Sequence, residues 1–543
     1  MGGGLLQLVA YGAQDAYITG NPHITFWKVL YKRHTNFAME AFRVNFTGAP
    51  QYGQRVVAVI NRNADLMYKT YLEVVLPDTQ TSATGAAYNV LWSNGGQRRL
   101  GYLLLKKIEV EIGGQIIDTH YGEWLYLWEN LTSNVDNSTK LDAMTGGQQG
   151  GAISSNISCG GRPSVMYIPL QFWFCRNPGL ALPLIALQYH EVRINITLSP
   201  ATDLVSKGSF SSVSAAASAL PQLKDMSLYI DYIYLDVDER RRFAQQSHEY
   251  LIDQLQYGLQ QTLSTANARI DLTLNHPVKE LIWVFQDARK TDCGSTTTAT
   301  AGYTQPFSYD DIADRCRIQI NGQDRFDERY GDYFWKVQPY QHHSGGGFYP
   351  ARNEASALTA TAAVPGISAS FTMVTAASGT SKTYTGLTGL LVPGMVLSGA
   401  GITAASYEVV ISAVVPTSAT AGSFTCTTFT STATTYTATS ANSGSQNFGA
   451  SGNATVSGSI ATTYQAANPI NVYSFALQPE EHQPSGTCNF SRIDTTTLVF
   501  DSVTSGGAGT FPSKSFPYNF RLYAVNYNIF RVMSGMGGLA YSN

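Results

Sequence analysis

The sequence predicts an all-β protein that contains two copies of one domain, and three observations support this prediction. The first is an internal repeat, in which residues 108–124 and 316–333 share one order of features. The second is the abundance of 32 Tyr and 24 Phe, which favour strands and interfaces over helical bundles. The third is a series of short apolar runs that are closed by Gly, Pro or Asn.

The repeat has the same order of features in both copies. Alternating apolar residues are followed by a tight Gly turn, a short second segment and an aromatic cluster. The first copy begins Ile108-Glu-Val-Glu-Ile-Gly-Gly-Gln and the second begins Cys316-Arg-Ile-Gln-Ile-Asn-Gly-Gln. The distance between the copies is too long for a solenoid, so we expect two whole β-domains in tandem.

The first domain is expected to span residues 27–237 and to follow an N-terminal arm. The arm, residues 1–26, contains Gly and Gln and cannot form its own core, so we expect it to pack on a neighbour or a partner. The polar residues 132–163 are expected to form a long surface loop. The expected strands lie at 39–46, 55–59, 68–76, 166–174, 190–198 and 229–237, with the first repeat copy at 103–128.

The second domain is expected to span residues 251–543. The densest charged run, residues 238–250, is interpreted as a linker between the two domains. The last strands are expected at 497–500 and 522–532.

An insertion is expected within the second domain. Residues 351–469 consist almost entirely of Ser, Thr, Ala, Gly and Val, which is also typical of a disordered linker. Short strand-like runs separated by turn residues nevertheless occur at 371–374, 390–397, 407–411 and 424–429. We therefore expect an inserted β-sandwich-like domain that projects from one loop end of the second domain.

Composition limits the classes of function. Charged residues make up 13% of the chain, against roughly 25% in an average soluble domain, so we expect a surface that is glycan-like or buried among neighbours. The formal net charge is −3 and no basic run is long enough for a nucleic-acid arm, so direct DNA binding is not expected. Lys28, Lys32 and Arg33 form a small basic cluster, which we interpret as a solvated or partner-facing patch.

The cysteines and the apolar segments bear on the compartment. Six scattered Cys without a C-x-x-C motif do not predict a disulfide framework, which agrees with folding in a reducing cytosol. The N-terminal residues lack the features of a secretory signal, and Leu6 breaks the myristoylation pattern. Residues 178–187 are too short and too rich in Pro to span a bilayer. We expect a chain that is neither secreted by this route nor membrane-spanning.

We recognise no motif for catalysis, a cofactor or a metal. The pairs at 190–191 and 248–249 begin like the zinc motif H-E-x-x-H but lack its second His. His342 and His343 are interpreted as a loop pair without a metal, since no carboxylate or Cys lies at ligand spacing. Glu123, beside two Trp residues, comes closest to a carbohydrate-enzyme site, but those aromatics belong to the repeated core element. We therefore expect no enzyme activity and no cofactor.

Three asparagines are candidate glycan-bearing residues. Asn137, Asn156 and Asn453 begin Asn-x-Ser/Thr triplets in loop-like stretches. These triplets are weak indicators without a secretory signal, because standard glycosylation needs the secretory lumen.

Contiguous runs of the chain resemble the major capsid proteins of nucleocytoplasmic large DNA viruses, in particular those of phycodnavirus-type and mimivirus-like viruses. The resemblance lapses at 351–469, where the family has a short loop. The runs that carry it lie at 8–15, 19–22, 24–26, 178–191, 321–326, 484–494 and 533–541.

The resemblance implies a double jelly roll, which is two eight-stranded sandwiches side by side. It also implies homotrimeric capsomers with pseudo-sixfold symmetry that tile an icosahedral shell over an internal lipid membrane and a double-stranded DNA genome. The implied location is the virion, with assembly in the host cytoplasm, and the implied partners are neighbouring capsomers and minor and penton capsid proteins. In this interpretation the arm and the basic cluster face inward, and the insertion caps the outer end.

Three other classes of protein agree with part of these observations. A surface glycan-binding β-sandwich protein agrees with the Ser/Thr-rich insertion and the aromatics, but it would need a signal peptide. A carbohydrate-active enzyme would need paired carboxylates near an aromatic platform. A minor or vertex capsid protein would generally carry one jelly roll, whereas the repeat predicts two.

Overall fold

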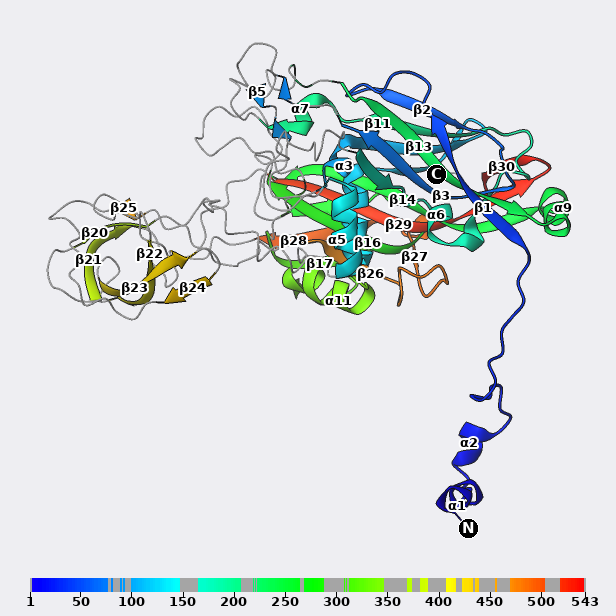
Figure 1. The fold of residues 1–543 in the computed structure, drawn as a ribbon, viewed down its shortest axis with the longest axis horizontal. Coiled ribbons are helices and arrows are strands. Elements are labelled where there is room, and N and C mark those ends of the chain that lie inside the picture. The colour runs from blue at the N-terminus through cyan, green and yellow to red at the C-terminus, as the bar shows by residue number, and fades with distance from the viewer. Residues whose placement is uncertain are drawn as a thin grey trace.

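A computed structural model describes most of the chain outside the insertion. The longer described stretches are residues 2–76, 99–146, 165–206, 222–263, 268–287, 312–345, 469–502 and 518–541. The structure also describes residues 80–81, 88–89, 91–92, 218, 220, 307 and 309, and the strand segments 369–373, 381–388, 407–416, 422–432, 435–438 and 455–456. Figure 1 shows two packed sandwiches, with the N-terminal arm extending from one end.

The first sandwich consists of two antiparallel sheets. One sheet has the order β1 (Phe37–Asn45), β13 (Asp225–Leu235), β3 (Leu66–Val75) and β10 (Leu182–Pro183), and β9 (Val165–Pro169) also pairs with β3. The other has the order β2 (Arg55–Ile60), β11 (Val192–Leu198), β7 (Leu105–Ile112) and β8 (Gln115–His120). Strands β9 and β10 pair with different parts of β3 and occupy one position, so each sheet has four positions and the sandwich has the eight of a jelly roll.

The second sandwich repeats this arrangement. One sheet has the order β14 (His248–Leu263), β29 (Tyr518–Met533), β16 (Pro277–Asp287) and β26 (Asn471–Ser474), with β27 (Cys488–Asn489) beside β16 and β30 (Met536–Leu539) beside β29. The other has the order β15 (Ala268–Asp271), β28 (Thr496–Ser502), β17 (Ala313–Ile320) and β18 (Gln323–Asp324), with β19 (Arg329–Tyr330) beside β17. The all-β prediction of a double jelly roll is confirmed.

The repeated sequence forms the same hairpin twice. β7 and β8 are joined by Gly113 and Gly114, whose φ angles are 60° and 86°. β17 and β18 are joined by Asn321 and Gly322, whose φ angles are 49° and 77°. Two-residue hairpins favour positive φ at both central residues, which Gly and Asn tolerate best. The sequence pattern is therefore explained by the turn geometry.

The aromatic cluster after each hairpin is helical. Helix α4 (Gly122–Thr132) follows the first hairpin, and the π-helical turn η3 (Tyr333–Val337) with α11 (Gln338–His342) follows the second. The apolar residues Trp124, Leu125 and Trp128 of α4 are buried. Helix α4 lies between the sandwiches rather than on the surface, since its side chains contact residues of the second sandwich, as described below, whereas α11 packs on η3 and β26 of the second sandwich.

Two local expectations were wrong in their type of structure, and the expected linker is partly helical. Part of the expected loop 132–163 is the helix α5 (Val135–Met144), while residues 147–164 lie outside the described residues. The expected linker 238–250 contains the helix α9 (Val237–Gln245), which the Asp236 carboxylate caps by accepting from Val237 N–H at 2.8 Å. The expected strand 166–174 ends at Pro169 and is followed by α6 (Trp173–Arg176). The other helices among the described residues include α1 (Gly3–Val9), α2 (Asp15–Thr19), α3 (Leu100–Leu104), α7 (Ala201–Leu204) and the 3-10 turns η2 (Pro178–Leu180) and η5 (Phe490–Arg492).

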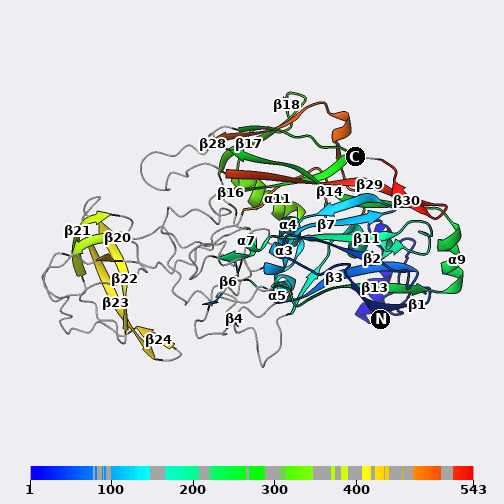
Figure 2. The same cartoon turned by 90° about the horizontal axis from the view of Figure 1, so that it is seen from above.

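The insertion contains one described antiparallel sheet. Its order is β22 (Tyr407–Pro416), β23 (Gly422–Thr432), β21 (Ser381–Thr388), β20 (Ala369–Met373) and β25 (Thr455–Val456), with β24 (Thr435–Ala438) beside β23. The expected runs at 371–374, 407–411 and 424–429 overlap strands of this sheet, whereas the run 390–397 lies outside the described residues. A second layer, which a sandwich requires, is not among the described strands of the insertion. Figures 1 and 2 place this sheet at the end of the molecule opposite α9.

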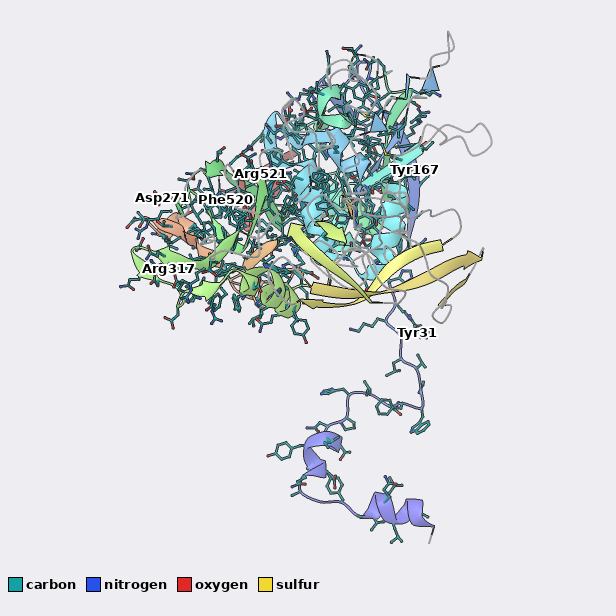
Figure 3. The ribbon with its side chains drawn as sticks, turned by 90° about the vertical axis from the view of Figure 1, so that its left-hand side faces the viewer. Tyr31, Tyr167, Asp271, Arg317, Phe520 and Arg521 are labelled. Atoms are coloured by element: carbon teal, nitrogen blue, oxygen red, sulfur yellow. The ribbon has the colours of Figure 1, made fainter. Side chains whose placement is uncertain are left out.

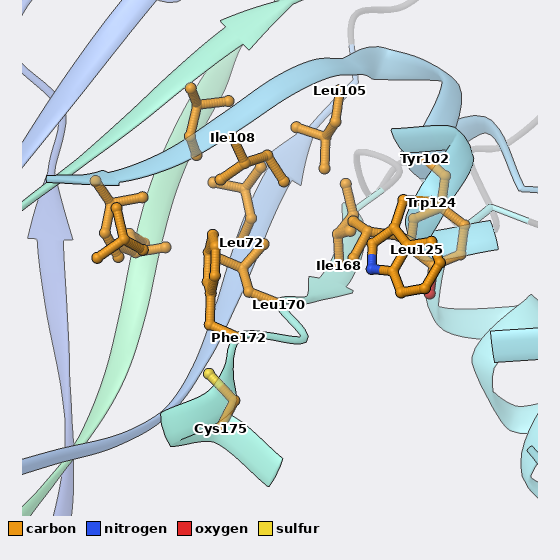
Figure 4. Packing of buried hydrophobic residues seen from close by; sticks show 14 of the residues in the cluster. Leu72, Tyr102, Leu105, Ile108, Trp124, Leu125, Ile168, Leu170, Phe172 and Cys175 are labelled. Atoms are coloured by element: carbon orange, nitrogen blue, oxygen red, sulfur yellow. The ribbon is translucent and has the colours of Figure 1, made fainter. Parts of the chain in front are cut away.

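The two sandwiches share part of their core. The largest apolar cluster fills the first sandwich, where Figure 4 shows Leu72 of β3, Ile108 of β7 and Phe172 between the ribbons. The same cluster includes Ile282 of β16 and Phe530 of β29 from the second sandwich. Because apolar burial stabilises by roughly 25 cal/mol per Å², a shared core fixes the sandwiches to each other as one body.

Candidate functional site

The candidate functional features of this chain are exposed surfaces and the contacts between its two sandwiches. Among the described residues, no group of three or more His, Cys, Asp or Glu side chains could hold a metal ion. In the same part of the chain, no helix has the length and apolar character needed to cross a membrane. The features that remain are the arm, the contacts between the sandwiches and the end of the molecule at β30.

No residue of the N-terminal arm is buried among the residues that the structure describes. Residues 2–36 leave the body at the start of β1, and Figures 1 and 3 show them extending away from both sandwiches, with Tyr31 near the root. Neither α1 nor α2 has a buried residue. Trp27 is 95% exposed, Tyr31 is 85% exposed and Phe26 is 84% exposed. A segment this apolar needs a surface that the isolated chain does not provide.

The basic cluster lies on this arm. Lys28, Lys32 and Arg33 are all exposed and alternate with the apolar residues of the extended segment. Residues 16–39 contain no Asp or Glu. The structure therefore places the cluster on the arm and away from the sandwiches, where a partner could contact it.

An ion pair that is largely shielded from solvent joins the two sandwiches. Glu123 of α4 accepts from the guanidinium of Arg521 on β29, with 2.7 Å between Oε1 and Nη2. The hydroxyls of Tyr523 and Tyr309 donate to the same carboxylate at 2.5 Å and 3.0 Å. Burial, and then the Glu123 charge, raises the pKa of Tyr523 well above its ordinary value, so this hydroxyl stays a donor. Glu123 is thus a structural acceptor, in contrast to the carbohydrate-enzyme alternative.

His343 forms a second buried connection, which the sequence did not reveal. Its Nε2 lies 3.1 Å from Glu280 Oε2 and its Nδ1 lies 3.0 Å from Glu480 Oε1. Burial lowers the pKa of His343, but the two carboxylates outweigh burial and raise this pKa to about 9. The imidazole is therefore held as a cation at neutral pH. No local spacing could have predicted this cluster, because both carboxylates come from segments far away in the sequence.

The residues after His343 attach this cluster to α4. Ser344 Oγ donates to the Thr132 carbonyl at 3.0 Å, and Gly345 N–H donates to the Leu131 carbonyl at 2.7 Å. Ser344 N–H also donates to Glu480 at 2.9 Å. The interpretation of His342 and His343 as a loop pair did not include the two carboxylates that His343 contacts, or the hydrogen bonds by which Ser344 and Gly345 link the second sandwich to α4.

A third charged group lies at the same interface. Lys279 Nζ is fully buried and lies 2.9 Å from Asp253 Oδ2. Arg176 of the first sandwich reaches the same oxygen at 3.4 Å, and its guanidinium stacks 4.4 Å from the centre of the Trp128 ring. These contacts, with the two clusters above, fix the relative orientation of the sandwiches.

The C-terminal hairpin, formed by β29 and β30, packs back onto the first sandwich. Tyr189 N–H donates to the Gly535 carbonyl at 3.0 Å, and Gly537 N–H donates to His190 Nδ1 at 3.2 Å. Gly535 has a φ of 79°, and a Cβ there would lie 2.6 Å from the Tyr189 ring. The turn can approach Tyr189 this closely only because residue 535 is glycine.

The candidate glycan-bearing residues are only partly described. Asn137 is exposed on α5. Asn156 and Asn453 lie outside the described residues.

Two family models match nearly the whole chain. The model described as "Major capsid protein N-terminus" matches residues 25–236, and the model described as "Large eukaryotic DNA virus major capsid protein" matches residues 239–352 and 426–538. The chain belongs to the major capsid proteins of large eukaryotic DNA viruses. The predicted resemblance is thereby confirmed, and the family is one of structural proteins of the virion capsid rather than of enzymes.

Full-length relatives agree with this assignment. The chain is 40% identical to the "Major capsid protein" of Pyramimonas orientalis virus, 34% identical to "Capsid protein 1" of Acanthamoeba polyphaga mimivirus and 33% identical to the "Major capsid protein" of Paramecium bursaria Chlorella virus 1. Each alignment covers 100% of both chains.

Solved structures agree as well. A chain of the PBCV-1 virus capsid matches with a TM-score of 0.60 and 29% identity over 96% of this chain and 100% of that chain. The Faustovirus major capsid protein matches in fold, with a TM-score of 0.55 and 11% identity over 96% of this chain and 94% of that chain. The family model skips residues 353–425, which include β20, β21 and β22 of the inserted sheet, whereas β24 and β25 lie within its matched residues.

Proposed function

We propose that this major capsid protein forms homotrimeric capsomers with pseudo-sixfold symmetry, which tile an icosahedral shell together with minor and penton capsid proteins. The supporting observation is the pair of equivalent jelly rolls held side by side by a shared core. Three chains of this kind present six similar corners, which a hexagonal lattice requires. A ring of three is a closed heterologous assembly, in which each copy offers different surfaces to its two neighbours.

The mass of the purified chain in solution tests this proposal. Light scattering at low micromolar concentration should give a species of three times 58.9 kDa. A stable monomer over the whole concentration range would contradict self-assembly into capsomers without a further factor.

The two ends of the molecule support a proposed orientation in the shell. The inserted sheet and the arm root lie at opposite ends of the long axis (Figures 1 and 2). We infer that the insertion faces outward and that the arm, with Lys28, Lys32 and Arg33, faces inward, toward minor capsid proteins or an internal lipid membrane. Limited proteolysis of intact particles should cut within 351–469 and spare residues 1–26. Cleavage confined to residues 1–26 would contradict both placements.

We also infer the limits of the domains and the place of assembly. We take residues 27–237 and 251–543 as the two domains, residues 238–250 as their connection and 351–469 as the inserted domain. Assembly in the host cytoplasm agrees with the thiols of Cys175 and Cys488, which form no disulfide among the described residues.

Asn137, Asn156 and Asn453 remain candidates for a glycan. Peptide mapping of purified particles would show a mass increase on any asparagine that carries one, and unmodified peptides at all three positions would remove them as candidates.

A further inference from the structure

We propose that the arm of each copy docks on the C-terminal hairpin of the next copy in the trimer. The occupant of that surface is thus a second copy of this chain. The inference rests on the proposed trimer and deepens it, because it names the segment and the surface that close the ring.

The exposed apolar area of the arm is that of a stable interface. Six apolar residues lie within eight consecutive positions and are 67–95% exposed: Ile24, Phe26, Trp27, Val29, Leu30 and Tyr31. Aromatic side chains of this kind bury about 150–250 Å² each, so the three aromatics and three aliphatics approach the roughly 800 Å² that one partner contributes to a standard interface. The apolar surface continues into β1, where Phe37 is 53% exposed and Met39 is 47% exposed.

Stoichiometry favours a second copy as the occupant. Every copy carries an arm, so the surface that covers the arms must be as abundant as the chain itself. In a shell composed mainly of this chain, another copy meets that requirement directly. In a closed ring of three, each arm has one receiving surface and each receiving surface has one arm.

A receiving surface of matching character lies on the C-terminal hairpin. We define the tip patch as Tyr189, Met533 and Met536, which are 76%, 49% and 52% exposed. The hydrogen bond from Tyr189 N–H to the Gly535 carbonyl holds the three residues together at the hairpin turn. Methionine side chains adapt to irregular apolar partners, and a tyrosine offers a flat apolar face.

The geometry favours the neighbour over the same chain. The tip patch and the arm root lie at the same end of the molecule, since β30, α9 and the start of β1 are all at the end opposite the inserted sheet in both views (Figures 1 and 2). The arm continues away from its own body at that end, as Figure 3 also shows. Residues 24–36, when extended, span about 40 Å at roughly 3.3 Å per residue, which is sufficient to reach a neighbouring copy.

Photo-crosslinking of the full-length chain tests this proposal. Trp27 is replaced by p-benzoylphenylalanine, the oligomer is isolated by size exclusion, and the irradiated sample is separated on a denaturing gel. We expect bands at the mass of crosslinked dimers and trimers, with crosslinked peptides that join residue 27 to residues 186–191 or 530–541.

The other outcomes distinguish failure of the arm exchange from failure of the proposed trimer. A crosslink confined to the monomer band, or an intact trimer without crosslinks at the tip patch, would overturn the arm exchange and leave the trimer standing. A monomer in solution before irradiation would overturn the trimer and the arm exchange together.

Matched arm variants separate apolar docking from charge attraction. The variant Trp27→Ser with Leu30→Ser should raise the trimer dissociation constant about tenfold or more, because burial of two large apolar side chains exceeds the ~1.4 kcal/mol that a factor of ten represents. The control Lys28→Ser with Lys32→Ser should leave the trimer within about threefold. Equal effects of both pairs would contradict apolar docking.

The receiving side has its own variant. Met533→Ser with Met536→Ser should remove the intermolecular crosslink from residue 27 while the folded chain is retained, since both side chains are about half exposed. An undiminished crosslink to the hairpin in this variant would show that the arm does not rely on the tip patch.

Discussion

Arg521 and Glu123 form an ion pair of 2.7 Å between the second jelly roll and the first. Each side chain is 13% exposed, so both charges have lost most of their hydration. Two tyrosine hydroxyls and Gln286 make further hydrogen bonds with the pair. The relative position of the two jelly rolls is thus specified by a polar cluster as well as by the shared apolar core.

Removal of one partner of this ion pair should lower the free energy of unfolding. Glu123→Gln or Arg521→Met leaves an uncompensated buried charge or donor, which typically costs about 3–5 kcal/mol. The double variant Glu123→Gln with Arg521→Met should cost clearly less than the sum of the single variants, because no charge remains unpaired. Denaturant titration of the four chains measures the coupling free energy, and additive single effects would contradict a direct interaction.

His343 predicts a specific pH dependence of stability. Its folded pKa of about 9 exceeds its ordinary value of 6.5, because Glu280 and Glu480 outweigh burial. The stabilisation is therefore complete below pH 6.5 and is lost as the pH rises through about 9, with a magnitude on the order of 2–3 kcal/mol.

Denaturation midpoints between pH 6 and pH 10 measure this effect. His343→Gln should flatten the alkaline decline, whereas His342→Gln is the matched control, since His342 makes one hydrogen bond to the Leu477 carbonyl at the surface. A decline of equal size in both variants would assign the pH dependence to other groups.

The first hairpin predicts a contrast between two adjacent glycines. A Cβ at Gly113 would lie 2.3 Å from His190 Nδ1, whereas a Cβ at Gly114 would have no atom within 4 Å. Both have positive φ, so Gly114→Ala should cost roughly 1 kcal/mol from backbone strain alone. Gly113→Ala should cost clearly more, because His190 must also move. Thermal unfolding of both variants checks this order, and equal losses would contradict the close approach of His190.

Substitution of Phe172 should show how much the shared core contributes to the free energy of unfolding. Its side chain is fully buried and stacks on His120, with 4.3 Å between ring centres. Phe172→Ala should cost about 3–5 kcal/mol from lost burial and the cavity that it leaves. Tyr340→Ala, at a residue that is 86% exposed, should change the free energy of unfolding by less than about 0.5 kcal/mol in the isolated chain. Chemical denaturation measures both.

Local sequence patterns predicted the strands better than the helices. Alternation in β2 places Val56, Ala58 and Ile60 on the buried face, and such alternation can be recognised without a structure. Helices α5 and α9 are mostly polar and short, so they lack the apolar periodicity that identifies a helix. The sequence therefore predicts a loop at 132–163 and a linker at 238–250, and it does not predict the helices within them.

The candidate functional residues also fall into those that the sequence reveals and those that it does not. Lys28, Lys32 and Arg33 could be found as a cluster because they are neighbours in the sequence. His343, Glu280 and Glu480 could not be found as a group, because their proximity results from the packing of separate segments.

The sequence by itself determined the features that depend on a few adjacent residues. These include the positive-φ turns at Gly113-Gly114 and Asn321-Gly322, the alternating strands and the repetition that leads to two jelly rolls. Only the tertiary structure decided which buried charges pair, how the two jelly rolls face each other and that the arm is not buried against the described part of its own chain. The physical reason is that a turn or a strand depends on local backbone preferences, whereas burial and ion pairing depend on which distant segments come into contact.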